Sequence, residues 1–161
     1  MTFYKPNILI KIMKYENRFG KEIPKSYLSF LNENPDGCYL DFRIDPEYNS
    51  ETKLFGESEL MNNVEMNFIG NAFQFESLKL NIKFQRDFGF TDLDEPNLNE
   101  EEMKRVENGF VIGFGENFGG YGYLYLDASE NHSVWLYYDN DGRISKIANS
   151  FEEFINNTKM L

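Results

Sequence analysis

The sequence predicts an α+β fold in a single domain over residues 1–161, with N-terminal helices, an antiparallel β-sheet meander and a closing C-terminal helix. Three observations predict this class. Apolar residues follow helical spacing before residue 34, four β-patterned segments lie between residues 110 and 148, and a helix-capping pattern starts at residue 150. A chain of 161 residues fits one domain, and no repeat, low-complexity tract or linker divides it.

Two helices are expected near the N-terminus. The first is predicted over residues 7–17, before Gly20, and its apolar stripe consists of Ile8, Leu9, Ile12 and Met13. Pro24 suits the first position of the second helix, because that position needs no N–H donor. The buried face of this second helix is expected to consist of Tyr27, Leu28, Phe30 and Leu31.

The next segments are a turn, a strand and a region with two alternatives. Residues 34–37 read Asn-Pro-Asp-Gly, which is turn chemistry, and residues 38–44 have a strand pattern followed by a polar loop through Asn49. Farther on, strand alternation is shown by Leu78, Leu80, Ile82 and Phe84. A helical face would instead contain Leu78, Ile82, Gln85 and Phe88 or Gly89. We favour the strand.

The last third of the chain predicts a meander that ends in a helix. An acidic surface loop over residues 91–102 leads into a short helix at 99–107. Strands are then expected at 110–114, 121–127, 133–138 and 143–148, with an Asp-Gly hairpin turn at 139–142. Ser150 and Glu153 form a capping box for the closing helix, and its apolar face consists of Phe151, Phe154 and Ile155.

A glycine-rich stretch at residues 112–127 resembles a phosphate-binding loop in the spacing of Gly113, Gly115 and Gly119. A dinucleotide fingerprint needs a helix after the glycines, because the helix N-terminus supplies the amide donors for the phosphates. The residues that follow have a β pattern instead. The glycines therefore predict the corner of a β-hairpin, and no nucleotide cofactor is implied.

Alternation along the meander separates two faces of the predicted sheet. The aliphatic face consists of Leu124, Leu126, Val134 and Leu136. The opposite, aromatic face consists of Tyr121, Tyr123, Tyr125, Trp135 and Tyr137. Helices either cover this aromatic face and satisfy its hydroxyl groups internally, or leave it exposed as a docking surface for a partner.

Charge and composition exclude several classes of protein. The formal net charge is −11, with six basic and two acidic residues in the segment 1–26 and a net charge of −15 on the remainder. Such a surface repels nucleic acid phosphates and attracts basic partners, although it also simply favours solubility. Neither a signal peptide nor a membrane span is recognisable, so we expect a cytoplasmic protein.

Catalytic and metal sites are not indicated. Cys38 is the single cysteine and is expected to be a small buried side chain at the start of a strand. His132 is the single histidine and is expected to face solvent in a loop without a nucleophile motif nearby. The acidic segments lack the spacing of a calcium loop. We therefore expect no enzyme activity, no catalytic residues, no metal and no cofactor.

Three blocks of the sequence resemble the SUKH superfamily, the Smi/Knr-like domains that include a fungal cell-wall assembly regulator and many bacterial immunity proteins. The first block is residues 23–34 (IPKSYLSFLNEN). The second comprises residues 110–115 (FVIGFG), the pair Gly119-Gly120 and residues 123–127 (YLYLD). The third comprises residues 147–148 and 150–155 (SFEEFI). The resemblance implies an α+β fold in which the glycine segment is a strand–turn–strand.

By this resemblance, the expected function is neutralisation of a cognate bacterial toxin, commonly a nuclease or deaminase, by tight stoichiometric binding inside the producing cell. The alternatives are a regulatory or scaffold module that binds other proteins, and an enzyme acting on a small molecule. The candidate partner-binding carboxylates are those of Asp92, Asp94, Glu95, Glu100, Glu101 and Glu102. The aromatic face named above is the candidate source of anchors, and the partner is expected to be a basic protein.

Overall fold

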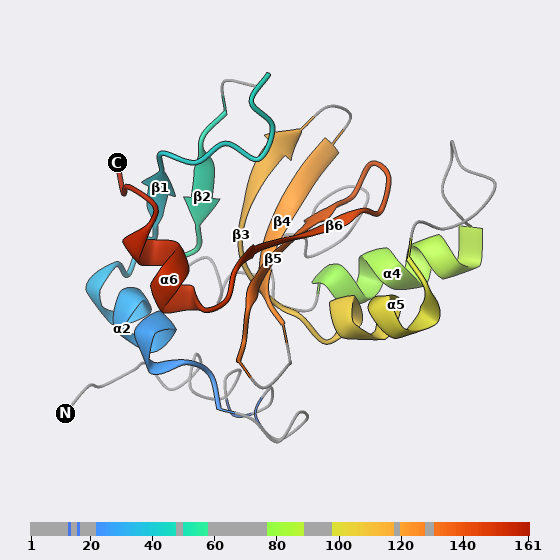
Figure 1. Cartoon of the computed structure of the whole chain (residues 1–161), viewed down its shortest axis with the longest axis horizontal. Coiled ribbons are helices and arrows are strands. Elements are labelled where there is room, and N and C mark those ends of the chain that lie inside the picture. Colours follow the sequence, from blue (N-terminus) through green and yellow to red (C-terminus); the bar gives the residue numbers. More distant parts are fainter. Residues whose placement is uncertain are drawn as a thin grey trace.

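The computed structural model describes residues 13, 16, 22–47, 50–57, 77–88, 98–117, 120–127 and 131–161. Six strands form one antiparallel sheet whose spatial order is the chain order, from β1 at one edge to β6 at the other (Figure 1). The strands are β1 (Cys38–Leu40), β2 (Thr52–Leu54), β3 (Phe110–Asn117), β4 (Gly120–Leu126), β5 (Val134–Tyr138) and β6 (Ile144–Ala148). The helices of the described residues are α2 (Lys25–Glu33), α4 (Ser77–Phe88), α5 (Glu100–Glu107) and α6 (Phe151–Asn156). The predicted α+β class is confirmed.

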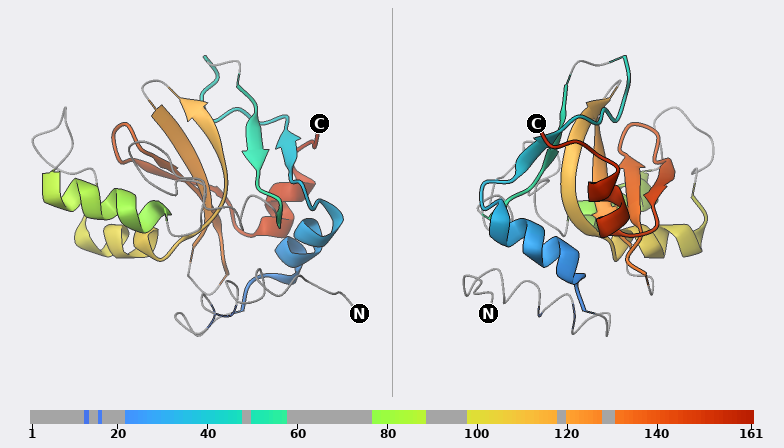
Figure 2. Two further views of the ribbon diagram at one scale, coloured as in Figure 1. Left: turned by 180° about the vertical axis from the view of Figure 1, so that it is seen from behind. Right: turned by 60° about the vertical axis from the view of Figure 1, so that its left-hand side comes forward.

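The helices form two pairs on opposite sides of the sheet (Figures 1 and 2). Helices α2 and α6 pack together on one side, and α4 and α5 pack together on the other. Side chains paired across antiparallel strands share a face, so Phe110 and its partner Leu126 belong to the aliphatic face. Tyr27 of α2 contacts Phe110, which shows that α2 covers this face. Gln85 of α4 donates a hydrogen bond to the Tyr137 hydroxyl, so α4 covers the aromatic face.

The aliphatic face and its two helices are joined by a cluster of aromatic rings. Tyr27 meets Phe110 edge to face at 5.7 Å between ring centroids, and it meets Phe151 of α6 at 5.1 Å in the same manner. Phe30, one turn along α2, meets Phe151 at 5.7 Å. Edge-to-face geometry is the preferred arrangement of aromatic quadrupoles. The cluster therefore fixes α2 and α6 to each other and to the sheet.

The segment 77–88 is helical, so the favoured strand prediction is wrong. Leu78, Ile82 and Gln85 are buried, whereas Phe84 is 56% exposed. This burial follows the 3.6-residue period of a helix and breaks the alternation that a strand would need. Helix formers such as Leu, Lys, Gln and Arg dominate the segment. The alternation was misleading because positions 78 and 82 satisfy both periods.

Other expected boundaries are mostly confirmed. The second helix begins one residue after Pro24, which is its N-cap. It buries Tyr27, Phe30 and Leu31 as predicted, whereas Leu28 is only partly buried. The strand expected over residues 38–44 ends at Leu40, and β2 was not anticipated at all. Of the first predicted helix, only Met13 and Glu16 are described, and both are helical. Its other residues lie outside the described part of the chain.

The glycine-rich stretch is a hairpin of two strands, as predicted, but β3 continues to Asn117. Gly113 and Gly115 therefore lie inside the strand and not at its corner. A Cβ atom on Gly113 would lie 2.4 Å from the Lys53 carbonyl oxygen of β2. The absence of a side chain at this position thus allows β2 to approach β3 closely.

Both later helices begin with a side-chain cap. Asn99 of α5 accepts a hydrogen bond from the Glu102 N–H at 2.8 Å, and Glu102 accepts one from the Asn99 N–H at 3.1 Å. Ser150 of α6 accepts from the Glu153 N–H at 3.0 Å, as predicted, but the Glu153 carboxylate reaches the N–H of Asn149 instead of that of Ser150. Each cap satisfies amide donors that the first helical turn cannot pair.

We expect Tyr27→Ala to lower the free energy of unfolding by about 3–5 kcal/mol, the range for loss of a large buried aromatic side chain. The reason is that Tyr27 is fully buried between α2, α6 and β3. Urea denaturation measures this loss. The matched control is Tyr39→Ala on the exposed side of β1, which should cost less than about 1 kcal/mol. Equal losses in the two variants would contradict the role given to the cluster.

Candidate protein-binding surface

The acidic residues predicted to contact a partner are only partly described. Glu100 and Glu101 are exposed at the start of α5, and Glu100 forms a 2.7 Å ion pair with Arg86 of α4. Glu102 is half-buried and serves in the helix cap. The remaining candidates, Asp92, Asp94 and Glu95, lie outside the described residues. The structure thus leaves two exposed carboxylates of this set on α5.

The aromatic face is covered over most of its described area. Tyr123, Tyr125 and Tyr137 are 1%, 2% and 0% exposed, and burial raises the pKa of all three phenol groups. A partner has no access to these rings in this conformation. These three candidates therefore belong to the core and not to an exposed docking surface. The other alternative, that helices cover this face, holds for them because α4 packs there.

Two residues of the aromatic face remain partly exposed. Tyr121 packs edge to face on Phe114 at 5.6 Å. The Trp135 indole N–H donates to the Ser133 hydroxyl at 2.8 Å, and the Arg105 guanidinium lies 5.4 Å from the ring centroid of Trp135. These side chains are held by neighbours and still reach the surface, so they stay candidates for partner contact.

His132 is buried, which contradicts the expectation that it faces solvent. It is 5% exposed, and its backbone has a φ of 47°, a left-handed conformation that suits the tight turn before β5. Cys38 opens β1 as expected, and partial burial raises the pKa of its thiol. Among the described residues, no group of three or more His, Cys, Asp or Glu side chains is arranged to hold a metal ion.

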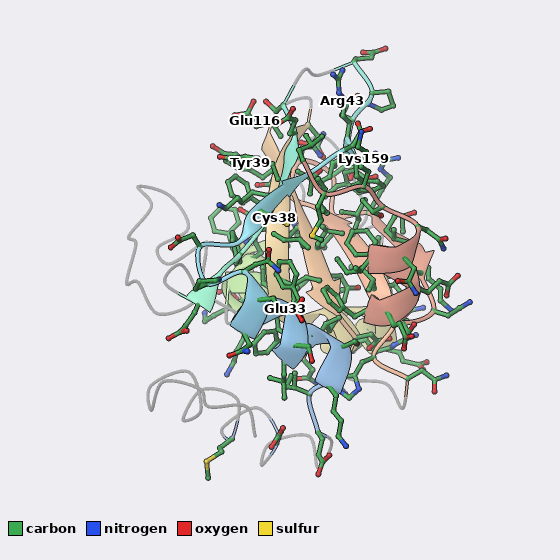
Figure 3. All side chains as sticks on the ribbon, turned by 90° about the vertical axis from the view of Figure 1, so that its left-hand side faces the viewer. Glu33, Cys38, Tyr39, Arg43, Glu116 and Lys159 are labelled. Atoms are coloured by element: carbon green, nitrogen blue, oxygen red, sulfur yellow. The ribbon has the colours of Figure 1, made fainter. Side chains whose placement is uncertain are left out.

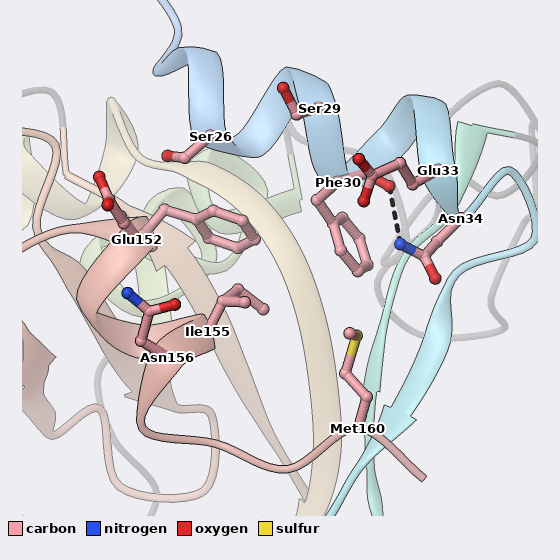
Figure 4. Close-up of a pocket in the computed structure, with 10 residues that line it drawn as sticks. Ser26, Ser29, Phe30, Glu33, Asn34, Glu152, Ile155, Asn156 and Met160 are labelled. Carbon is pink, nitrogen blue, oxygen red and sulfur yellow. Dashed lines mark hydrogen bonds between the residues drawn. The ribbon is translucent and has the colours of Figure 1, made fainter.

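A half-open groove of about 270 Å³ lies between α2 and α6 (Figure 4). Its lining residues are Ser26, Ser29, Phe30, Glu33, Asn34, Phe151, Glu152, Ile155, Asn156 and Met160. Sequence reasoning missed this groove because its two walls are more than a hundred residues apart in the chain. Within each helix, the only local sign of a groove is a set of small or polar residues next to the apolar stripe.

The C-terminal residues complete the groove by lying along the edge strand β1. The Asp41 N–H donates to the Lys159 carbonyl at 2.8 Å, and the Leu161 N–H donates to the Tyr39 carbonyl at 2.9 Å. Met160 between them forms a bridge with Leu40 and extends its side chain toward the groove, 46% exposed. Figure 3 views this edge, with Tyr39 and Lys159 above Cys38 and Glu33 below it on α2.

The fold defined by these elements is an α+β meander with helices on both faces, and comparison with known proteins assigns its family. The model of the SUKH_6 family, described as SMI1-KNR4 cell-wall, matches residues 11–155. The chain belongs to this family. Its domains are in general non-catalytic immunity or regulatory modules. No curated protein and no solved structure gives a significant match.

No helix in the described part of the chain has both the length and the apolar character needed to cross a membrane.

Asp139 lies at the start of the β5–β6 turn, and its side chain is partly buried. Its carboxylate accepts a hydrogen bond from the Tyr121 N–H at 2.7 Å, and its own N–H donates to the Tyr121 carbonyl at 3.0 Å. Desolvation by burial raises the pKa of Asp139 from 3.8 to about 6, although the hydrogen bond from Tyr121 opposes this shift.

We expect Asp139→Asn to stabilise the protein at neutral pH. Because the folded-state pKa exceeds the unfolded value of 3.8, stability from this group is fully present below 3.8 and is lost as the pH rises through about 6. A pKa shift of about two units corresponds to about 3 kcal/mol in the free energy of unfolding. Partial exposure of the carboxyl group reduces this contribution to about 1–2 kcal/mol. The amide oxygen still accepts from Tyr121. In urea denaturation, the free energy of unfolding of the variant should therefore exceed that of the wild type at pH 7.5 and equal it near pH 4. A gap that is the same at both pH values would contradict this account.

Proposed function

We propose that this protein is an immunity protein, which binds and neutralises a cognate bacterial toxin by stoichiometric protein–protein contact in the cytoplasm of the producing cell. The proposed toxin is a basic nuclease or deaminase. Membership of the SUKH family is the observation that carries this proposal, since immunity is one of the two roles of such domains. The proposal needs no cofactor, no membrane and no direct contact with nucleic acid.

The charge of the chain supports a basic partner. The net charge is −11, and the excess of acidic residues lies after residue 26. Enzymes that act on nucleic acids carry basic clefts, so an acidic protein associates with them rapidly through long-range attraction. The described surface offers exposed carboxylates on α2, α5 and α6, the elements that carry Glu33, Glu101 and Glu152.

A regulatory or scaffold module is the second candidate function. The cell-wall description of the matching family favours it, because that description fits a regulatory role better than immunity. The two candidates differ in what the partner does. An immunity protein silences a toxic activity, whereas a scaffold leaves its partner active. The gene neighbourhood separates them at low cost, since a large toxin reading frame beside the gene supports immunity.

Co-expression with the toxin encoded beside its gene tests the proposed function. We expect cells that carry both genes to survive induction, and cells that carry the toxin with an empty vector to die. The purified pair should form an equimolar complex. Its dissociation constant should rise about tenfold or more between 50 and 300 mM NaCl, because screening weakens the attraction between opposite charges.

Two results would contradict the proposal. Survival no better than with the empty vector would show that the protein does not neutralise this toxin. Formation of a complex in which the toxin keeps its full activity would favour the scaffold alternative instead.

A further inference from the structure

The groove between α2 and α6 has an apolar floor with a polar rim. Phe30 and Phe151 line it from opposite helices, and Ile155 and Met160 add further apolar side chains to its lining. Phe30 and Phe151 contact each other edge to face at 5.7 Å between ring centroids, and both are buried. A preformed apolar pocket of this kind is where an interface places its central anchor.

The volume of the groove limits what it can hold. Pockets for drug-sized ligands measure about 300–1,000 Å³, and this groove, at about 270 Å³ and open to solvent, is smaller. That space suits one or two protein side chains. The hydroxyl groups of Ser26 and Ser29 and the amide of Asn156 on the rim can exchange hydrogen bonds with the backbone of a docked segment.

The charge of the rim selects the kind of partner. In the part of the chain that the structure describes, the ionisable side chains that line the groove are those of Glu33 and Glu152, one from each helix, and neither Lys nor Arg lines it. Among the described residues, neither carboxylate takes part in an ion pair. Two carboxylates on opposite sides of an apolar floor are complementary to an apolar residue flanked by cations.

We propose that this groove is the anchor site for the toxin, and that it receives an apolar side chain of the toxin flanked by Lys or Arg residues that pair with Glu33 and Glu152. This inference rests on the proposed function and deepens it by placing the contact on α2 and α6. A second copy of this chain is the poorer occupant, because it would bring another acidic rim toward the first and carries a charge of −11 itself.

Variants at the exposed rim test the site without disturbing the core. Ser29→Arg adds a bulky cation to the groove from an exposed position of α2. The double variant Glu33→Lys/Glu152→Lys reverses the charge of the rim. Its matched control is Glu47→Lys/Glu51→Lys, which makes the same change at two exposed positions before β2 that do not line the groove. Thermal unfolding of every variant checks that the fold is retained.

We expect binding of the purified toxin, followed by biolayer interferometry, to separate these variants. Ser29→Arg should weaken binding about 30-fold or more, mainly through faster dissociation, because an anchor pocket contributes most to the lifetime of a complex. Reversal of the rim should slow association about tenfold at 50 mM NaCl and less at 300 mM. The Glu47→Lys/Glu51→Lys control should stay within about threefold of the wild type.

The methyl group of Met160 gives a direct readout of occupancy. With ¹³C-methyl-labelled methionine, addition of toxin should shift the Met160 signal, whereas the signal of Met103, which lies on the buried face of α5, should stay in place. Met160 lines the groove, so its methyl group reports contact whether or not a variant changes the affinity.

Three outcomes would overturn the inference, and they are distinguishable. Failure of the wild type to bind would overturn the proposed function together with the site. Tight binding by the wild type and equally by Ser29→Arg, with an unshifted Met160 signal, would overturn the site alone. A wild-type dimer in sedimentation that Ser29→Arg dissociates would assign the groove to a second copy of this chain.

Discussion

The edge-to-face packing of Tyr27 against Phe110 and Phe151 is the contact on which the arrangement of this protein depends. It joins an N-terminal helix, the central sheet and the C-terminal helix, three elements that are far apart in the chain. Because aromatic rings bury large areas and prefer defined geometries, such a contact fixes both the distance and the angle between the elements. The groove between α2 and α6 exists because this contact holds the two helices side by side.

The two faces of the sheet have different environments for a physical reason. The aliphatic face packs on α2 and α6, where Leu124 and Leu136 need no hydrogen-bond partner. The other face carries tyrosines, whose hydroxyl groups need polar neighbours when they are buried. Helix α4 places Gln85 against Tyr137 and provides such a neighbour. The aromatic residues that first suggested a docking surface therefore serve mainly as core.

Sequence reasoning succeeded where the signal was local. Helix α2, the meander and the cap of α6 follow from periodicity, turn residues and a serine–glutamate pair within a few positions of one another. It failed for α4 because the apolar residues at 78 and 82 satisfy the periods of a strand and of a helix. The two periods differ in which side chains they bury. That burial depends on the sheet face that carries Tyr137, more than fifty residues away in the chain. The burial of His132 and the existence of the groove are likewise products of tertiary packing.

In the proposed complex, recognition depends on complementarity between an anionic rim and a cationic protein, with an apolar anchor at the centre. Hydrogen–deuterium exchange of the protein, free and in complex with the neighbouring-gene toxin, tests this most directly. The toxin should slow exchange at residues 25–34 and 151–161 and leave exchange at residues 100–107 unchanged. Slower exchange confined to residues 100–107, or a toxin that changes exchange nowhere, would contradict it.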